Sequence, residues 1–385
     1  MGAGAMSKQS EWARWNGADE VAATLGVEEE VMLLHPGSWG LAQRIEDVLE
    51  VVPGELQAQV SSETHSAAVE IQTGVHRSVQ SAVGEIASLR CHLTELLEPL
   101  DLRAACSGTH PFAIWHDMRV AGAERHQAVF GSMRALARRE PTFALHVHVG
   151  IPTPAGATAA LNQMRAHIPL LLALSANSPY WQGRDTGLAS ARTPLFQAFP
   201  RVGIPRVFSS YADWTRSIDL LIGSSALPDH TYLWWDVRLQ PKYGTVEVRI
   251  MDAQSTTEHT AALVALVQCL VRLEVLEGYA SSRVLHAQEV LDENRFLAAR
   301  DGTAAELIDP DRGTRVPVTE LAYEVLEACA PHARALGCAD ELDLVRTVLL
   351  ADPGAHHQRT LAGEDDDQRR LVAALAESFS PVAVS

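Results

Sequence analysis

Short apolar runs that also carry charged residues are spread over the first two thirds of the chain. Residues 24–34 predict a strand with three glutamates, and residues 66–73 and 142–151 predict two more strands with polar side chains inside them. Residues 234–240 and 245–251 predict a hairpin closed by a Pro-Lys-Tyr-Gly turn. A purely structural sheet does not bury carboxylates, because an unpaired buried acid is costly. These strands are therefore expected to carry a site.

Helical spacing of apolar residues dominates much of the remaining chain. Helices are predicted over residues 41–52, 78–100 and 157–175, the last with a kink at Pro169. Residues 177–208 are rich in Gly, Pro and Arg and show no periodicity. They predict a long loop, and a loop of this length usually has a function.

The chain is expected to form one domain that contains both helices and strands. Residues 1–22 are small and polar without a signal-peptide pattern, and they are expected to form a flexible N-terminal arm. Residues 23–385 are expected to form the single domain, whose C-terminal part, about 257–385, is largely helical. Its predicted interruptions are an insert at 307–317 and an acidic loop at 364–367.

Composition narrows the class of protein. With 385 residues, 47% of them hydrophobic and 21% charged, the chain can bury a sizeable core, which excludes disordered and fibrous proteins. The formal net charge of −17 argues against nucleic acid or an anionic membrane as a partner. The most apolar stretch, 261–276, is shorter than the roughly 20 residues that cross a bilayer, so it predicts a buried helix. Five scattered cysteines indicate neither a disulfide framework nor a cysteine zinc site, and a cytoplasmic location is expected.

Glu28 and Glu30 share one face of the first predicted strand, and Glu29 points to the other face. Their Cβ atoms are expected about 6.6 Å apart, because a strand rises about 3.3 Å per residue. Two buried carboxylates at this spacing stay ionised only beside cations, and such oxygen ligands suit Mg²⁺ or Mn²⁺ bound to phosphate. An exposed edge strand with solvated charges explains the spacing equally well.

Polar residues on the second and third predicted strands extend this pattern. Glu70 lies within an apolar run where an unpaired acid is costly, whereas Glu63, just before it, reads on its own as a surface residue. His146 and His148 share a strand face and could bind zinc, a harder metal or phosphate. Zinc would need further nitrogen or sulfur ligands. Two half-buried histidines bonded to neighbours are the plain alternative.

Glu247 and Arg249 share a face of the second hairpin strand. An acid beside a guanidinium suits a metal–nucleotide site, and a mutual salt bridge is the alternative. The segment 177–206 holds four arginines, Arg192 among them, against one acid, a local charge of +3 that indicates an anion site. The chain has no P-loop, no dinucleotide-binding glycine motif and no serine-hydrolase elbow.

Eight short motifs along the chain match those of one known family. They are G-V-E-E-E at 26–30, V-E-I-Q-T-G-V at 69–75, G-T-H-P-F-A at 108–113, H-V-H-V-G at 146–150, L-S-A-N-S-P-Y-W-Q-G-R-D-T-G-L-A-S-A-R at 174–192, W-W-D-V-R at 234–238, G-T-V-E-V-R at 244–249 and E-N-R-F-L-A-A-R at 293–300. Together they resemble the bacterial glutamate-cysteine ligase type 2 family, the carboxylate-amine ligases. The resemblance spans residues 24–380, and no single motif has to carry it.

The resemblance implies an α+β, glutamine-synthetase-like fold: a curved, mainly antiparallel sheet that forms a funnel, with helices packed outside. It implies a ligase that uses ATP and Mg²⁺, or Mn²⁺ in its place, to activate a carboxylate such as glutamate as an acyl phosphate. An amine then displaces the phosphate to form an amide. The implied partners are small-molecule carboxylates and amines, with no nucleic acid and no membrane, and a homodimer is left open.

The same resemblance implies roles for individual residues. Arg192 and Arg249 fall on phosphate-binding positions and are the expected catalytic residues. His148 is expected at the nucleotide, and the choice between His146 and His148 as a metal ligand stays open. The implied metal ligands are Glu28, Glu30, Glu63, Glu70, His146 and Glu247.

Departures from the family pattern concern the substrate. Ser66-Ala67-Ala68 replaces a more polar run, and Leu188 and Ala191 replace residues that are often aromatic, so ligation of an unusual amine is as credible as glutathione synthesis. A zinc-dependent amidohydrolase that uses His146, His148 and the carboxylates, without a nucleotide, is the second hypothesis. A catalytically inactive binding subunit is the third, and the complete set of acids and arginines weighs against it.

Overall fold

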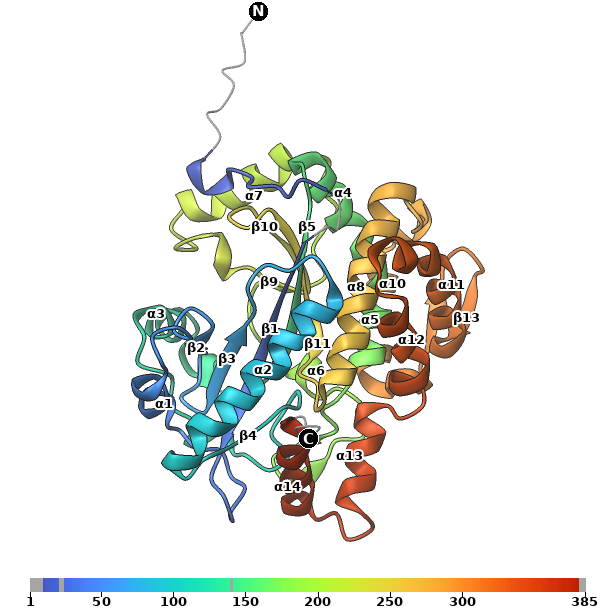
Figure 1. Ribbon diagram of the computed structural model, residues 1–385. Helices are drawn as coiled ribbons and strands as arrows, with labels where there is room; N and C mark the ends of the chain where they lie inside the picture. The colour runs from blue at the N-terminus through green and yellow to red at the C-terminus, as the bar shows by residue number, and fades with distance from the viewer. Residues whose placement is uncertain (1–9, 21–23, 139–140, 381–385) are drawn as a thin grey trace, which may run out of the picture.

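A central antiparallel sheet organises the part of the chain that the computed structural model describes, which comprises residues 10–20, 24–138 and 141–380 (Figure 1). Its strands are β1 (Leu25–Leu34), β2 (Val60–Ser62), β3 (Ala68–Gln72), β4 (Arg103–Ala105), β5 (Ala144–Gly150), β10 (Val237–Gln240) and β11 (Thr245–Asp252). The strand order is β10-β11-β5-β1-β3-β2, and β4 pairs with the end of β1. The expected strands and the β10–β11 hairpin are confirmed.

Two layers of helices pack against this sheet, as Figure 1 shows. The first layer contains α2 (Val79–Leu97), α4 (Pro154–Met164), α5 (Ile168–Ser175) and α8 (Thr257–Glu277), each in contact with a strand. The second contains α10 (Gln288–Asp301), α11 (Val318–Leu336) and α12 (Ala339–Leu344), which pack on α5 and α8. The α+β fold implied by the sequence is therefore confirmed.

Shorter elements complete the described chain. The remaining α-helices are α1 (Ile45–Val51), α3 (Glu124–Met133), α6 (Arg192–Phe196), α7 (Tyr211–Gly223), α9 (Ser282–Leu285), α13 (Gly354–Ala362) and α14 (Gln368–Phe379). The strands outside the central sheet are β6 (Tyr180–Trp181), β7 (Arg184–Asp185), β8 (Val202–Gly203), β9 (Trp234–Trp235), β12 (Glu306–Asp309) and β13 (Thr314–Pro317). Four of these short elements, β6, β7, α6 and β8, lie inside the segment that the sequence predicts as one irregular loop.

Strand alternation gives the sheet an apolar face and a polar face. On β5, Val147 and Val149 are fully buried in the main apolar cluster, which also contains residues of α4, α5 and α8. Glu29 points to this helix-covered side and pairs with Arg90 of α2 at 2.8 Å, as its position on the strand predicts. The polar face is therefore left free for Glu28 and Glu30.

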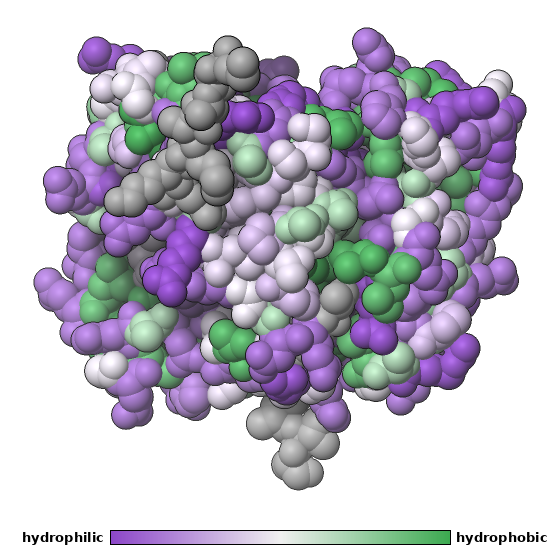
Figure 2. All heavy atoms as spheres, turned by 90° about the horizontal axis from the view of Figure 1, so that it is seen from above, coloured by the Kyte–Doolittle hydropathy of each residue, from purple (hydrophilic) through white to green (hydrophobic). Residues whose placement is uncertain are grey.

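The longest apolar helix, α8, belongs to the core. It is the one described helix that is long and apolar enough to cross a membrane, yet 78% of its most apolar window is buried inside the protein. The face seen from above in Figure 2 is mostly hydrophilic, with hydrophobic residues in small groups. The expectation of a buried helix is confirmed.

Pro169 starts a helix instead of kinking one. The predicted helix 157–175 is divided into α4 and α5 by a single 3₁₀ turn at Arg165–His167. Pro169 lies in the first turn of α5, where its missing N–H has no intrahelical partner to lose. The predicted helix 41–52 is also shorter than expected, because α1 begins at Ile45.

Residues 10–16 of the expected flexible N-terminal arm contact the rest of the domain in the structure, while residues 1–9 and 21–22 lie outside the described chain. The indole N–H of Trp12 donates to Asp219 at 2.9 Å, and that of Trp15 donates to the carbonyl of Ile151 at 2.9 Å. The hydroxyl of Tyr211 donates to the carbonyl of Ala13. Two large aromatic side chains gain enough from packing on the main apolar cluster to hold this polar segment in place.

Candidate active site

Cross-strand pairing brings the candidate acids and histidines together on the polar face of the sheet. Glu28 of β1 lies opposite His146 of β5, and His148 of β5 lies opposite Glu247 of β11. On the other side of β1, Glu30 lies opposite Glu70 of β3. Directly opposed residues point to the same face of a sheet, so residues from four strands form one polar stripe.

Three overlapping groups in the described chain have the side chains and spacing to hold a metal ion. Within each group, one potential ligand atom from every residue lies within 4.8 Å of the others. The groups are Glu28 with His148 and Glu247, Glu28 with Glu70 and His146, and Glu30 with Glu63 and Glu70. All six residues expected as metal ligands are thus brought together, and His148 joins them.

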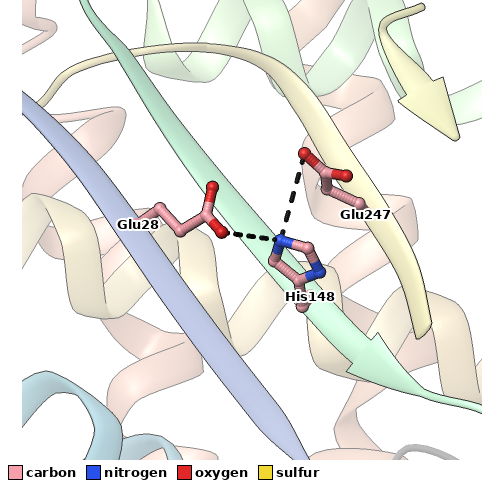
Figure 3. A group of neighbouring side chains, drawn as sticks. All are labelled: Glu28, His148 and Glu247. Carbon is pink, nitrogen blue, oxygen red and sulfur yellow. Dashed lines mark ion pairs between the residues drawn. The ribbon is translucent and has the colours of Figure 1, made fainter. Parts of the chain in front are cut away.

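His148 is aimed at two carboxylates (Figure 3). Its Nε2 atom is 3.2 Å from Oε1 of Glu28 and 3.9 Å from Oε1 of Glu247. This buried nitrogen forms an ion pair with each carboxylate, while Nδ1 is fixed by the hydroxyl of Thr245 at 3.0 Å. Burial opposes protonation of His148, but Glu247 and Glu28 raise its pKa, so a metal cation among these three residues would take the place of the imidazole proton.

Two of the acids resist ionisation. Burial and the nearby charge of Glu63 raise the pKa of Glu30 to about 8. Burial and the charges of Glu28 and Glu63 raise the pKa of Glu70 well above its usual range. The described protein groups around these acids therefore do not compensate their negative charge, as expected of a site that takes up cations.

The other acids are held ionised by basic neighbours. Burial opposes this effect, but His148 and His146 keep the pKa of Glu28 below its usual value. Burial also raises the pKa of Glu247, but Arg238 and Arg249 keep it well below its usual value. Burial and Arg249 lower the pKa of His146 to about 4, so its ring is neutral near pH 7 and retains a lone pair for a ligand.

The metal-free protein is expected to lose stability as the pH rises through about 8. The pKa of Glu30 is near 8 in the folded chain and about 4.3 in an unfolded one, so the folded state binds the extra proton between these values. That contribution is complete below about pH 4.3 and is lost as the pH passes 8. Melting temperatures from pH 6 to 9 in EDTA should fall less steeply in Glu30→Gln than in wild type, and equal slopes would contradict the assignment.

The two candidate arginines lie beside this cluster, and both also make structural contacts. Arg249 pairs with Glu247, which is the plain alternative considered for it. Arg192, from α6, donates to the carbonyls of Ile250 at 2.9 Å and Arg249 at 3.2 Å, where β11 has an irregular register against β5. The Nε atom of Arg192 is buried without a described partner. Both arginines therefore make structural contacts with β11, and Arg192 keeps one donor for a ligand.

The broader anion site expected from the four loop arginines is wrong. Arg206 pairs with Asp213 at 2.9 Å on the surface, Arg201 lies over the ring of Trp234, and Arg184 is exposed. Arg192 alone of the four lines the cavity that contains Glu30. The path of the loop, not its local charge, decides which arginine reaches the cluster.

The sequence interpretation missed Arg238 and Gln240, which fix Glu247. The guanidinium of Arg238 donates to both carboxylate oxygens of Glu247, at 2.6 and 3.1 Å, and the amide of Gln240 donates at 2.8 Å. Arg238 lies directly opposite Glu247 in the hairpin. The register of the predicted hairpin contained this signal, because residues equidistant from its turn face each other.

Cavities flank the cluster on two sides. One is lined by polar Glu30, Glu63, His146, Arg192 and Arg249. Its apolar wall consists of Val129, Met133, Ala137, Phe196, Phe199 and Trp234. The other, of about 260 Å³, includes Glu28 and His148 in its lining. The acids and arginines thus lie between two spaces in which different molecules could meet.

Comparisons with known proteins agree on one family. The sequence model of glutamate-cysteine ligase family 2 (GCS2) matches residues 24–374. "Putative glutamate--cysteine ligase 2-1" of Rubrobacter xylanophilus is 38% identical over 358 residues, which cover 93% of this chain and 95% of that protein. "Putative glutamate--cysteine ligase 2" of Sorangium cellulosum is 36% identical over 360 residues, covering 93% and 96%.

Solved structures share the fold. The glutamate–cysteine ligase of Francisella tularensis, solved in complex with AMP, has a TM-score of 0.71 at 12% identity and covers 96% of this chain and 91% of that one. A bifunctional glutathione synthetase from Pasteurella multocida has a TM-score of 0.66 at 12% identity, covering 93% of this chain and 52% of that one. The chain therefore belongs to glutamate-cysteine ligase family 2 and is an amide-bond-forming carboxylate-amine ligase.

Proposed function

We propose that this protein is an ATP-dependent ligase that converts a carboxylate, such as that of glutamate, into an acyl phosphate. An amine then displaces the phosphate to form an amide, with release of ADP and phosphate. The observation that carries the proposal is the set of three overlapping carboxylate–imidazole groups, with Arg192 and Arg249 beside them. Phosphoryl transfer requires alignment and charge neutralisation more than covalent help from the protein, and this set is suited to both.

Divalent cations fit the donor set. Carboxylates outnumber imidazoles in the three groups, which favours Mg²⁺ or Mn²⁺ over zinc. The uncompensated charge at Glu30 and Glu70 supports the same conclusion. When bound, the cations would neutralise the charge of the phosphates. The ligands proposed are Glu28, Glu30, Glu63, Glu70, His146 and Glu247, with His148 beside the nucleotide or as a further ligand.

We assign Arg192 and Arg249 to the transferring phosphoryl group. Both line the cavity that contains Glu30 and Glu63, and a guanidinium offers a planar fork that matches phosphate oxygens. The apolar wall opposite them supports this role, because an acyl phosphate must be kept from water until the amine arrives.

Conservative replacement of these arginines is expected to lower kcat at least about tenfold, because lysine keeps the charge but loses the fork. Arg249→Lys should keep its melting temperature, since lysine can still pair with Glu247 and Arg238 remains in place. The melting temperature of Arg192→Lys should fall by a few degrees at most, because one of the two backbone carbonyls that Arg192 binds loses its hydrogen bond. Measuring kcat, the KM for ATP and the melting temperature tests this. Arg206→Lys, at an exposed pair with Asp213, is the matched control. Normal kcat with a lowered melting temperature would make the arginine purely structural.

A panel of amino acids and amines, assayed for ADP release with Mg²⁺ or Mn²⁺, tests the proposed reaction. We expect ADP and phosphate to form in equal amounts with the amide, and only when both substrates are present. Formation of AMP and pyrophosphate would contradict an acyl-phosphate intermediate. Amide hydrolysis with zinc and no nucleotide would support the amidohydrolase, which the carboxylate-rich ligand groups do not favour.

We also infer a reducing compartment such as the cytoplasm for this reaction. All five cysteines are free, and four of them are buried. When the protein is unfolded in the presence of a thiol-blocking reagent, mass spectrometry should find all five cysteines modified. In the folded protein, the four buried cysteines should stay unmodified. A disulfide in the protein from its native host would contradict the inference.

A further inference from the structure

A cavity of about 330 Å³ lies among α5, α9, α10, α11 and the β12–β13 hairpin. It shares no lining residue with the two cavities beside the acid groups. Its walls are largely apolar, formed by Pro169, Leu170, Leu291, Leu307 and Val325 among others. This size, with apolar walls and a few polar groups, is typical of a site for a small organic molecule.

His167 gives the cavity a polar end. Its side chain lines the cavity while the residue is only 5% exposed. Its Nε2 is 2.5 Å from a carboxylate oxygen of the buried Glu274, which also accepts from the backbone N–H of Ala280. The carboxylate orients the ring through Nε2, and no described residue hydrogen-bonds to Nδ1. Tyr279 stacks on this ring, with centroids 6.3 Å apart.

The rim of the cavity is acidic. Asp309, Asp311 and Glu324 line it against one guanidinium, that of Arg312, which leaves a formal charge of −2. Arg312 is already engaged, 3.0 Å from Asp309 and 2.6 Å from Glu324. Arg283, 3.9 Å from Asp311, and Glu320, 2.7 Å from Arg312, together leave this charge unchanged. A ligand anion would therefore meet net negative charge, whereas a ligand cation would be attracted.

We propose that this cavity binds a small aromatic amine, with its ring against the apolar walls and its ammonium group at the acidic rim. A hydroxyl group of the ligand, which can donate or accept, hydrogen-bonds to Nδ1 of His167. The aromatic ring suits the stacked Tyr279 and His167. This site does not depend on the reaction proposed at the acid groups, because the two share no residue.

Three related probes test the proposed chemistry on the full-length protein by isothermal titration calorimetry. Tyramine carries the ring, the ammonium group and a hydroxyl, and should bind most tightly. Phenethylamine lacks the hydroxyl and should bind several-fold more weakly. 3-(4-Hydroxyphenyl)propionate carries a carboxylate instead of the ammonium group and should bind at least tenfold more weakly than tyramine. No binding of tyramine at millimolar concentration, or equal binding of the acid, would overturn the proposal.

Two variants and one control variant test whether the amine binds in this cavity and not at the acid groups. Leu321→Trp fills the cavity from α11 and should weaken tyramine binding at least tenfold, whereas Leu220→Trp, at an exposed position on α7, should leave it unchanged. Glu324→Gln keeps the side-chain size and should weaken binding a few-fold by removing one rim charge. Tyramine binding that is the same in all three variants as in wild type would show that the amine binds elsewhere, and the proposal would fail.

Discussion

Replacing Glu28 with glutamine is expected to lower kcat for amide formation by about 100-fold or more, while the protein stays folded. Glu28 belongs to two of the three candidate metal groups and contacts both histidines. Glutamine keeps the shape but removes a hard anionic ligand, so cations at both groups would be held less tightly. Steady-state kinetics over a range of Mg²⁺ concentrations, with Glu50→Gln on the exposed side of α1 as control, measure the effect.

Glu70→Gln extends this test to an acid whose ionised form is disfavoured by burial and by neighbouring glutamates. Its kcat should fall by a similar factor, yet the metal-free protein should melt at the same or a higher temperature, because burial and three neighbouring glutamates disfavour the ionised carboxylate. Near-normal turnover of Glu70→Gln at saturating metal would remove Glu70 from the proposed ligands.

Replacing Glu29 with glutamine is expected to have the opposite outcome, a loss of about 3–5 kcal/mol in the free energy of unfolding with little change in kcat. Glu29 and Arg90 are both fully buried on the helix side of β1, joined by two hydrogen bonds of 2.8 Å. Glutamine would leave the Arg90 guanidinium buried without its counter-charge. Urea unfolding measures the loss in the free energy of unfolding. The kcat of the folded variant, assayed without urea, shows whether the active site is affected.

A double variant separates the ion pair from its packing. Glu29→Leu with Arg90→Met removes both charges and should recover part of the lost stability, since apolar groups of similar size often replace a buried pair without penalty. If Glu29→Gln instead unfolded like wild type and lost its activity, Glu29 would belong to the site and not to the scaffold.

The opposite expectations for neighbouring residues 28 and 29 follow from strand alternation, which the sequence displays directly. Alternation placed Glu28 and Glu30 on one face and Glu29 on the other, and it placed His146 with His148. The structure agrees with each of these assignments. Local periodicity could predict them because the direction of a strand side chain depends only on its position in the strand.

Relations between distant segments could not be predicted in the same way. The motifs indicated the family, but Glu63 read as a surface residue until the turn after β2 brought it to Glu30 and Glu70. The four loop arginines looked alike, and only the position of α6 brings Arg192 to the cluster. Trp12 and Trp15 lie in a segment that reads as polar, and their partners Asp219 and Ile151 are far away in sequence.

The sequence by itself therefore determined the strands, the faces of Glu28, Glu29 and Glu30, the family and the class of reaction. Only the tertiary structure decided which residues contact each other. It places Glu28 opposite His146, pairs Arg238 with Glu247, and forms the separate cavity at His167. It also decided the charge state of the acids, since Glu30 and Glu28 share a strand face yet their pKa values shift in opposite directions. The reason is physical: side-chain direction is set by the local backbone, whereas burial and Coulomb interactions depend on neighbours that folding brings from elsewhere in the chain.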